Sequence, residues 1–564
     1  MTRPSSELPL KVHDDPWATH TVFNQVPPLE SENLFNADIA LAEAVKCFGG
    51  SWGLDDLAAY GALAGGPLWQ AGIDANRYPP ELETHDSMGN RVDHVRFHPA
   101  YHQLLEAAIG HGLHSLSWLR PGPGAHVVRS ALMYLHNQAE AGTMCPVTMT
   151  HASIPVLRQT PELAKVWVPR ILTGTYDPRF IPPERKAGLT IGMGMTEKQG
   201  GSDVRSNTTH ATPMGHSGHA EPYRITGHKW FLSAPMSDAF LVLARTDAGP
   251  GCFLMPRWRP DGTLNAIRIQ RLKDKLGNRS NASAEVEFQD AWAWMLGEEG
   301  RGIATIIEMV AQTRLDCLIG SAALMRQAVV QAVHHANYRQ AFGRRLVEQP
   351  LMQTVLADLA LESEAAILLG LRVAHAMDRS AANPQEAMLA RVVSAIGKYW
   401  VCKRAPGHVY EAMECLGGGG YIEQSIMPRL YREAPVNAIW EGSGNIQCLD
   451  VLRAFQRSPD ALEALRRELN AARGADSAYD HHLERIDRLL NGNRDTLQAR
   501  ARQLVEWLAL GLQASLLHRF GRAEVAFAFS AMRLREPHFC YGAAESTATA
   551  ILIKRALADR SIDP

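Results

Sequence analysis

The texture of the sequence changes twice, and these changes constrain the fold more than any other feature. From residue 36 to about 185, apolar residues recur at spacings of three and four, as in YHQLLEAAIGHGLHSL, which is typical of amphipathic helices. From 187 to about 299 the chain carries short β-branched and aromatic runs broken by Gly, Pro and Asp, as in GCFLMPRW and SAEVEFQDAWAWML. Helical spacing returns at 303. The sequence therefore predicts an α+β multidomain protein in which a β domain lies between helical domains.

These changes divide the chain into five parts. A chain of 564 residues is too long for one ordinary hydrophobic core, so several domains are expected. We expect an N-terminal extension (1–35), an N-terminal α-helical domain (36–185), a middle β domain (186–299), a C-terminal helical bundle (300–455) and an extra α-helical domain (456–564).

Composition argues against several functional classes. The net charge is −2, so no global field attracts nucleic acid or a membrane. The first residues lack the apolar region of a secretory signal, and the most apolar long window, 504–517, is too short to span a bilayer. Eight cysteines occur without a CxxC pair or metal-ligand spacing. We therefore expect a cytoplasmic protein with reduced thiols, no membrane association and no metal site.

The segment GMGMTEKQGGSDVRSNTT, residues 192–209, is the strongest candidate for a ligand-binding loop. It does not fit the GxGxxG dinucleotide fingerprint, because it enters an all-β region instead of opening a helix. It does not fit a Walker A loop either, because Gly-Gly-Ser-Asp stands where that loop needs Gly-Lys-Ser/Thr. On these residues alone, a turn-rich connector remains the alternative to a phosphate or cofactor site.

Five motifs together resemble the acyl-CoA dehydrogenase flavoprotein family. They are GMTEKQGGSDVRS (194–206), GHKWFLSA (227–234), YRQAFGRRLVEQ (338–349), ECLGGGGY (414–421) and IWEGSGNIQ (439–447). Their order and spacing agree with the family over about residues 36–455. The resemblance implies the acyl-CoA dehydrogenase fold and FAD as the cofactor, with the glycine-rich stretch as part of the flavin site.

The resemblance also implies which residues contact FAD. The backbone of a glycine-rich loop can approach a pyrophosphate closely because no Cβ intervenes. Thr196 would contact the flavin ring, and Arg339 would reach the FAD of a neighbouring subunit by charge-assisted pairing. Such shared sites imply a homotetramer, a dimer of dimers. For Trp230, ordinary packing in a β core is the alternative. The full expected set is Met193, Gly194, Met195, Thr196, Gly201, Ser202, Trp230, Phe231, Ser233, Arg339, Phe342, Gly417, Gly418, Trp440, Ser443 and Asn445.

Glu441 and Arg314 are the expected catalytic residues. In the family's reaction a carboxylate in a dry pocket removes the α-proton of an acyl thioester, and Glu441 in IWEGSGN matches that base. Arg314 in QTRLD matches an arginine near the active site. Without the resemblance, Glu441 would be a surface turn residue and Arg314 would form a salt bridge on a helix surface.

Several departures from the usual motifs resemble one branch of the family, which takes part in the adaptive response to DNA alkylation. Lys198-Gln199-Gly200 replaces a Pro-containing stretch, Glu414 stands where a glutamine is usual, and about 110 residues follow the usual end. This branch implies a FAD-containing tetramer that binds double-stranded DNA without sequence preference and has at most weak isovaleryl-CoA dehydrogenase activity. The alternatives are an active short- or branched-chain acyl-CoA dehydrogenase whose extra domain serves only assembly, and a protein whose flavin is structural.

Arginine dominates the cations of the extra helical domain. Residues 456–564 contain 15 Arg and one Lys. Guanidinium groups suit phosphates, although the arginine bias of the whole chain is an alternative explanation. For DNA binding we expect one basic patch made of Arg466, Arg473, Arg519, Arg522, Arg533 and Arg535.

Overall fold

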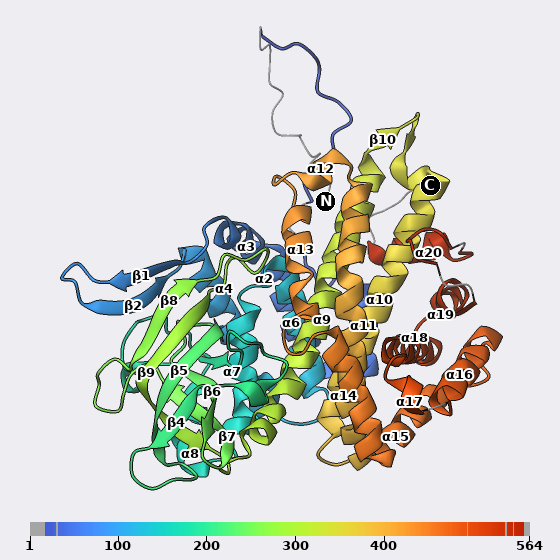
Figure 1. Cartoon of the computed structure of the whole chain (residues 1–564). Coiled ribbons are helices and arrows are strands. Elements are labelled where there is room, and N and C mark those ends of the chain that lie inside the picture. The colour runs from blue at the N-terminus through green and yellow to red at the C-terminus, as the bar shows by residue number, and fades with distance from the viewer. Residues whose placement is uncertain (1–16, 30–31, 493, 536–537, 545, 558–564) are drawn as a thin grey trace.

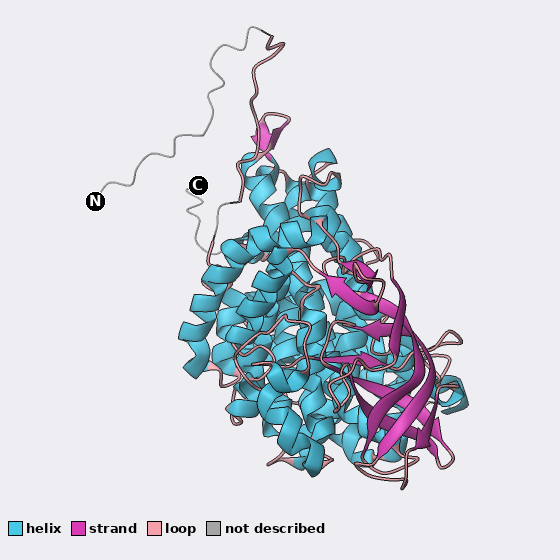
Figure 2. Cartoon of the chain, turned by 90° about the vertical axis from the view of Figure 1, so that its left-hand side faces the viewer, coloured by secondary structure: helices cyan, strands magenta, loops and turns pink. Residues whose placement is uncertain are grey.

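The computed structural model describes residues 17–29, 32–492, 494–535, 538–544 and 546–557. A β domain lies on one flank of a central bundle of long helices, and the last helices of the chain pack on the opposite flank (Figure 1). Figure 2 shows the strands of the β domain on one side of the helical body and a separate small hairpin at its upper end. The predicted α+β architecture, with a β domain inserted between helical domains, is confirmed.

The N-terminal domain is helical but also contains a β-hairpin that helical spacing did not predict. The hairpin pairs β1 (Glu81–His85) with β2 (Arg91–Arg96) in antiparallel register. Its turn is fixed by Asp86, whose Oδ1 accepts hydrogen bonds from the backbone N–H groups of Met88 and Asn90. The helices are α1 (Ile39–Cys47), α2 (Leu54–Gly65), α3 (Pro67–Arg77), α4 (Pro99–Gly110), α5 (Leu116–Leu119), α6 (Ala125–Ala139), α7 (Met144–Leu157) and α8 (Pro161–Ile171).

The middle domain is a seven-stranded sheet in the order β3-β5-β4-β6-β7-β9-β8, with additional pairings between β3 and β6 and between β5 and β9. Its strands are β3 (Ile191–Gly194), β4 (His210–Pro213), β5 (Pro222–Ser233), β6 (Ala239–Thr246), β7 (Gly249–Pro256), β8 (Ile267–Leu272) and β9 (Ser283–Leu296). Alternate residues of β6 enter two different cores: Phe240 and Val242 face one, and Leu241 and Leu243 face the other. Burial on both faces explains the continuous apolar run of this strand.

Three long helices form the bundle. They are α9 (Gly302–Tyr338), α10 (Pro350–Arg379) and α11 (Pro384–Cys415), followed by α12 (Gly418–Tyr421), α13 (Met427–Glu433) and α14 (Gly444–Arg457). Between α9 and α10, β10 (Gln340–Ala341) and β11 (Arg344–Arg345) form a short hairpin. At Gly397 an added Cβ would lie 2.4 Å from Cδ1 of Leu318, so glycine permits the close approach of α11 to α9.

The C-terminal module comprises α15 (Pro459–Asn470), α16 (Ser477–Leu490), α17 (Arg494–Leu497), α18 (Ala501–Phe520), α19 (Ala523–Phe529), a π-helical segment (Ser530–Arg535) and α20 (Thr549–Ala556). Its buried residues belong to the same hydrophobic core as the bundle. Polar contacts cross the junction as well, for example from Trp400 Nε1 to Gln513 Oε1 at 3.0 Å. The module is therefore packed as part of the helical body.

Within the described residues, no helix is both long enough and apolar enough to cross a membrane. In the same part of the chain, no three His, Cys, Asp or Glu side chains gather as a metal site would require.

Candidate active site

Glu441 lies at a strained point of the chain. It follows a 3₁₀ turn (Val436–Ala438) and has a φ of 55°, in the left-handed region that costs a non-glycine residue on the order of 1 kcal/mol. Lys398 on α11 holds this segment, because its Nζ donates to the carbonyl oxygens of Asn437, Trp440 and Gly442, each at 2.9 Å. The segment is thus fixed by the bundle and is not a surface turn.

The Glu441 carboxylate enters a small, mainly apolar cavity. Oε2 accepts a hydrogen bond from Thr313 Oγ1 at 2.7 Å. Burial raises the pKa of Glu441, while the Thr313 hydrogen bond and the charges of Lys398 and Arg314 oppose the rise. A raised pKa suits a carboxylate that must take up a proton. The cavity has a volume of about 40 Å³, and its walls include Met133, Met144, Cys145, Thr148, Ser233 and Trp440.

Arg314, on α9 directly after Thr313, is buried near this cavity. Its NH1 donates to Asp450 Oδ2 at 2.5 Å, and Asp450 is also held by Arg391 through two hydrogen bonds of 2.8 and 2.9 Å. The ion pair expected from the alternative interpretation is therefore present, but it is buried and close enough to Glu441 to influence its pKa.

The glycine-rich loop is anchored from beneath by a buried ion pair. Glu197 Oε1 lies 2.8 Å from Lys229 Nζ on β5, and both side chains are inaccessible to solvent. Glu197 also accepts hydrogen bonds from the backbone N–H groups of Thr208 and Thr209. Burial alone would raise the pKa of Glu197, but the Lys229 charge and the hydrogen bonds outweigh it and lower this pKa to about 2. The expected set of site residues omitted Glu197, Lys229 and Lys398.

Several of the expected FAD residues converge beside this loop. The backbone N–H of Trp230 donates to the backbone carbonyl of Thr196 at 2.9 Å, and Met193 pairs with Ser233 between β3 and β5. Ser233 also lines the Glu441 cavity, so the loop and the cavity are contiguous. The Lys273 ammonium lies 3.3 Å from the centre of the Trp230 indole, and Lys198 and Arg271 lie within 6 Å of it.

These residues fit FAD. An aromatic platform beside cations suits a flavin with its pyrophosphate, and the glycines of the loop let the phosphates approach its backbone. At Gly201 an added Cβ would lie 2.3 Å from Thr196 Oγ1, so position 201 leaves no room for a side chain. Exposed Ser202 follows it, at the position expected to meet the pyrophosphate.

Gly201→Ala is expected to weaken FAD binding by at least about tenfold. The added methyl group would clash with Thr196, so the loop must move to relieve the contact. A loss of about 1.4 kcal/mol in binding free energy already lowers affinity tenfold. Titration of the apoprotein with FAD, followed by flavin fluorescence, measures the change. Gly215→Ala is the matched control, since nothing lies within 4 Å of its added Cβ. Equal affinities for the two variants would contradict this role of Gly201.

The remaining expected FAD residues fall into two groups. Arg339, Phe342, Gly417 and Gly418 lie at the end of the bundle where Figure 1 shows β10 and α12, away from α14. Phe342 is 99% exposed there. Trp440, Ser443 and Asn445 follow the Glu441 segment, and Asn445 Oδ1 accepts a hydrogen bond from Arg502 of the C-terminal module at 2.8 Å. Within one chain, the group at the β10 and α12 end of the bundle therefore does not lie beside that chain's own glycine-rich loop.

The six arginines expected to bind DNA are not equally accessible. Arg533 is only 12% exposed and is enclosed by Asp358 and Glu362, and Arg519 donates to Glu468 at 2.8 Å. These two charges neutralise acids at the junction between the module and the bundle. Arg473, Arg522 and Arg535 are exposed, with Arg522 3.8 Å from Glu43, and Arg466 is half-buried 3.8 Å from Asp487. The structure thus does not present all six as one exposed patch.

Three family models match successive parts of the chain. The model "Adaptive response protein AidB N-terminal domain" matches residues 24–178. The models of the acyl-CoA dehydrogenase middle and C-terminal domains match residues 192–291 and 300–456.

Known proteins resemble the chain over most of its length. The AidB protein of Escherichia coli K12 is 50% identical over 477 residues, which are 84% of this chain and 87% of that protein. Acyl-CoA dehydrogenase family member 11 of Caenorhabditis elegans is 30% identical over 446 residues, 76% of this chain and 71% of that protein. The solved structure of Caenorhabditis elegans ACDH-11 in complex with C11-CoA superimposes with a TM-score of 0.84 at 26% identity and covers 94% of this chain and 96% of that one.

Proposed function

The chain belongs to the acyl-CoA dehydrogenase family, in its AidB-type branch, and from this premise we propose a FAD-dependent oxidoreductase that acts weakly on short branched acyl-CoA thioesters and also binds double-stranded DNA. Proteins of this family are FAD-dependent. The observation that supports the catalytic part is the Glu441 carboxylate, held by Thr313 in an apolar cavity that adjoins the glycine-rich loop through Ser233.

In the proposed reaction Glu441 removes the α-proton of the thioester. Bound FAD supplies the acceptor for the hydride that leaves the β-carbon. The raised pKa of Glu441 makes it a stronger base than an exposed glutamate, and the Thr313 hydrogen bond orients its carboxylate toward the cavity. Lys398 keeps the backbone of this segment rigid, so the base does not swing away from the substrate.

An acyl-CoA substrate is proposed because a structural relative has been solved with C11-CoA. The acyl chain that we propose is a short branched one, such as isovaleryl, as the resemblance to this branch of the family implies. Anaerobic mixing of the flavin-loaded protein with isovaleryl-CoA, followed by loss of flavin absorbance, tests this part of the proposal.

We further propose a homotetramer in which each chain completes a neighbour's FAD site. Arg339, Phe342 and the Gly417–Gly418 turn would supply this contribution from the far end of the bundle. Large apolar side chains are exposed at that end, including Phe342, Leu351 and Tyr421, and a patch of this kind is typical of a subunit interface. Size-exclusion chromatography with light scattering would give the mass of the assembly.

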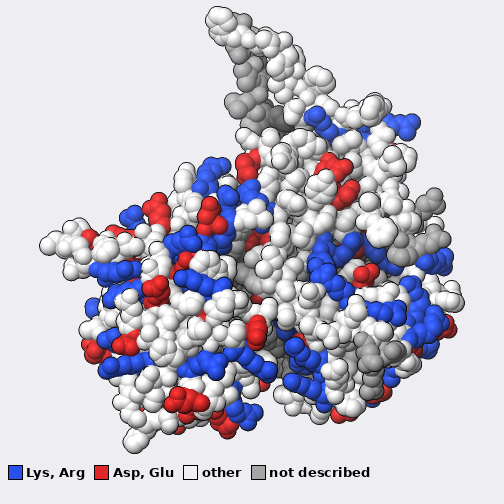
Figure 3. All heavy atoms as spheres, in the orientation of Figure 1, with Lys and Arg blue, Asp and Glu red and all other residues white. Residues whose placement is uncertain are grey.

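DNA binding is proposed for the C-terminal module, as part of a cytoplasmic role in the response to DNA alkylation. Figure 3 shows a group of Lys and Arg on the side of the molecule where the module lies, and further Lys and Arg over the β domain on the other side. Exposed guanidinium groups on this module include those of Arg473, Arg500, Arg502, Arg522 and Arg535. Such groups neutralise phosphates without reading the base sequence.

Arg473→Gln combined with Arg522→Gln is expected to weaken binding of a duplex and to lower the slope of log affinity against log salt by about 2, because each lost phosphate contact removes about one released counterion. Fluorescence anisotropy of a labelled duplex at several salt concentrations measures both quantities. Arg224→Gln, which removes an exposed arginine from β5, should leave them unchanged. An unchanged salt slope in the double variant would remove these two residues from the DNA site.

The alternative, an active dehydrogenase whose module serves only assembly, is favoured by one feature. Arg372 of α10 holds both Glu386 and Glu468, and Glu468 in turn holds Arg519, so the module is tied to the bundle by a buried ion network. If full-length protein does not bind duplex at low salt but is bleached rapidly by isovaleryl-CoA, this alternative replaces the proposal.

A further inference from the structure

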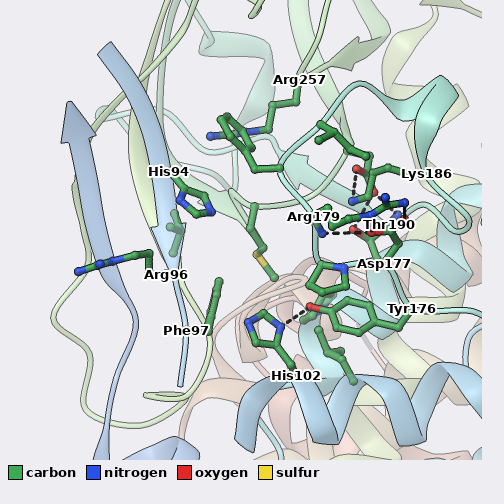
Figure 4. A pocket seen from close by; sticks show the side chains of 18 of the residues that line it. His94, Arg96, Phe97, His102, Tyr176, Asp177, Arg179, Lys186, Thr190 and Arg257 are labelled. Atoms are coloured by element: carbon green, nitrogen blue, oxygen red, sulfur yellow. Dashed lines mark hydrogen bonds and ion pairs between the residues drawn. The ribbon is translucent and has the colours of Figure 1, made fainter. Parts of the chain in front are cut away.

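A second cavity lies in the described chain, apart from the one at Glu441. It has a volume of about 360 Å³ and is enclosed by β2 and α4, by the segment 176–190 and by residues that follow β5 and β7 (Figure 4). The two cavities share no lining residue, although neighbouring residues Cys145 and Pro146 face one each. Its volume is in the range of small-molecule sites, roughly 300–1,000 Å³.

The charges of this cavity favour an anion. Its lining includes four cations and two acids, namely Arg96, Arg179, Lys186, Arg257, Asp177 and Asp238. Both acids are already paired, since Arg179 lies 2.6 Å from Asp177 and Lys186 lies 2.7 Å from Asp238. Arg96 lies 3.3 Å from Glu81, so Arg257 is the lining cation left for an arriving anion, which meets no free lining carboxylate.

Arg257 is the lining cation that forms no ion pair with a carboxylate of the described residues. It is 6% exposed, and its two terminal nitrogens donate to the backbone carbonyls of Pro235 and Asp93. Its Nε has no hydrogen-bond partner among the described residues. The Asp93 carboxylate is occupied by Arg91 at 3.0 Å. A buried guanidinium without a counter-charge is costly to maintain, and a ligand carboxylate in the cavity that Arg257 lines would supply this charge.

The remaining walls are flat and apolar. The centre of the Phe180 ring lies 4.9 Å from the Arg257 guanidinium and 5.3 Å from the centre of the Trp258 ring. His94 stacks on Phe180 with 5.0 Å between ring centres. Phe97 lines the cavity from the end of β2. Figure 4 shows Arg257 on one side of the open space and Phe97 and His102 across from it. A planar, apolar ligand body matches such walls.

We propose that this cavity binds a small organic carboxylate with a flat apolar body, its carboxylate at Arg257 and its body against the aromatic walls. The site goes beyond the proposed dehydrogenase and DNA functions, and its ligand would not contact Glu441 or the glycine-rich loop.

Benzoate titrated into the flavin-loaded, full-length protein tests the proposal by calorimetry and by ligand-observed NMR. Benzoate is expected to bind at least about tenfold more tightly than benzyl alcohol, which has the ring but no charge. Arg257→Gln should lower benzoate affinity by at least about tenfold, whereas Arg224→Gln, which removes an exposed arginine of the same domain, should not change it. The flavin spectrum should stay unchanged on binding, because the site is separate.

A second variant guards against a folding defect in Arg257→Gln. Met236→Trp fills the cavity from the segment after β5 and should abolish benzoate binding while thermal melting and flavin content stay near those of the parent protein. No binding up to millimolar benzoate, equal binding of benzoate and benzyl alcohol, or full binding to Met236→Trp would each overturn the proposal. A flavin spectral shift on binding would assign benzoate to the Glu441 cavity and overturn it as well.

Discussion

Glu441→Gln is expected to slow flavin bleaching by isovaleryl-CoA by about 10²- to 10⁴-fold, the usual contribution of a positioned general base. Glutamine keeps the size of the side chain and can keep the hydrogen bond with Thr313, but it cannot take up the α-proton. Anaerobic stopped-flow absorbance of the flavin-loaded protein measures the rate. Because only proton removal is lost, FAD content and thermal stability should stay close to those of the parent protein.

The pH profile gives an independent check of this role. Burial raises the pKa of Glu441, so its reactive carboxylate form is lost at a higher pH than for an exposed glutamate. The bleaching rate should therefore fall as pH decreases through this raised pKa. Glu463→Gln, at an exposed glutamate of α15, is the matched control and should bleach like the parent protein. Bleaching of Glu441→Gln at the parent rate would exclude Glu441 as the base.

Lys229→Met should lower the free energy of unfolding of the middle domain by about 3–5 kcal/mol, because it leaves the buried Glu197 carboxylate without its counter-charge. The glycine-rich loop is fixed through Glu197, so FAD affinity should fall in the same variant. Denaturant unfolding monitored by tryptophan fluorescence, together with flavin absorbance after gel filtration, measures both effects.

Two comparisons separate the ion pair from general damage. Lys229→Met combined with Glu197→Gln removes both charges and should be less destabilising than Lys229→Met alone. Arg301→Gln removes a partner from the exposed pair with Glu298 and should cost about 0–1 kcal/mol. If the double variant were no more stable than Lys229→Met, the buried charge would not be the cause.

The same ion pair predicts a dependence of stability on pH. The pKa of Glu197 is lowered to about 2 from an ordinary value of 4.5. Its contribution is therefore fully present above the ordinary value and is lost as pH falls from about 4.5 toward 2. Lys229→Met should lack this part of the acid transition, which an unfolding series at decreasing pH would reveal.

Local sequence motifs predicted the parts of the site that depend on backbone and on a single side chain. The glycine at 201 is required because no Cβ fits beside Thr196, and Glu441 stands in a segment whose conformation the neighbouring glycine permits. Requirements of this kind are set within a few residues and are therefore visible in the sequence.

Residues that act through partners distant along the chain could not be identified from the sequence. Lys398 precedes the carbonyl groups that it binds by about 40 residues, and Lys229 follows Glu197 by 32 positions. Each charged residue alone resembles an ordinary surface residue. The β1–β2 hairpin was missed for a related reason, since its polar strands have no strong alternating pattern and depend on an Asp86 turn.

The periodicity of the sequence by itself determined the succession of helical and β domains, because it is encoded locally. Its motifs, through their resemblance to the family, indicated the FAD cofactor and the candidate base Glu441. Only the tertiary structure decided which charged side chains are exposed and which are paired with an opposite charge. Arg533 and Arg519 resemble the other arginines of the module in the sequence, yet they are paired with acids from elsewhere in the fold. Arg257 is buried with an unused donor. The reason is physical: the effect of a charge depends on burial and on its nearest opposite charge, and both are set by segments that meet only when the chain folds.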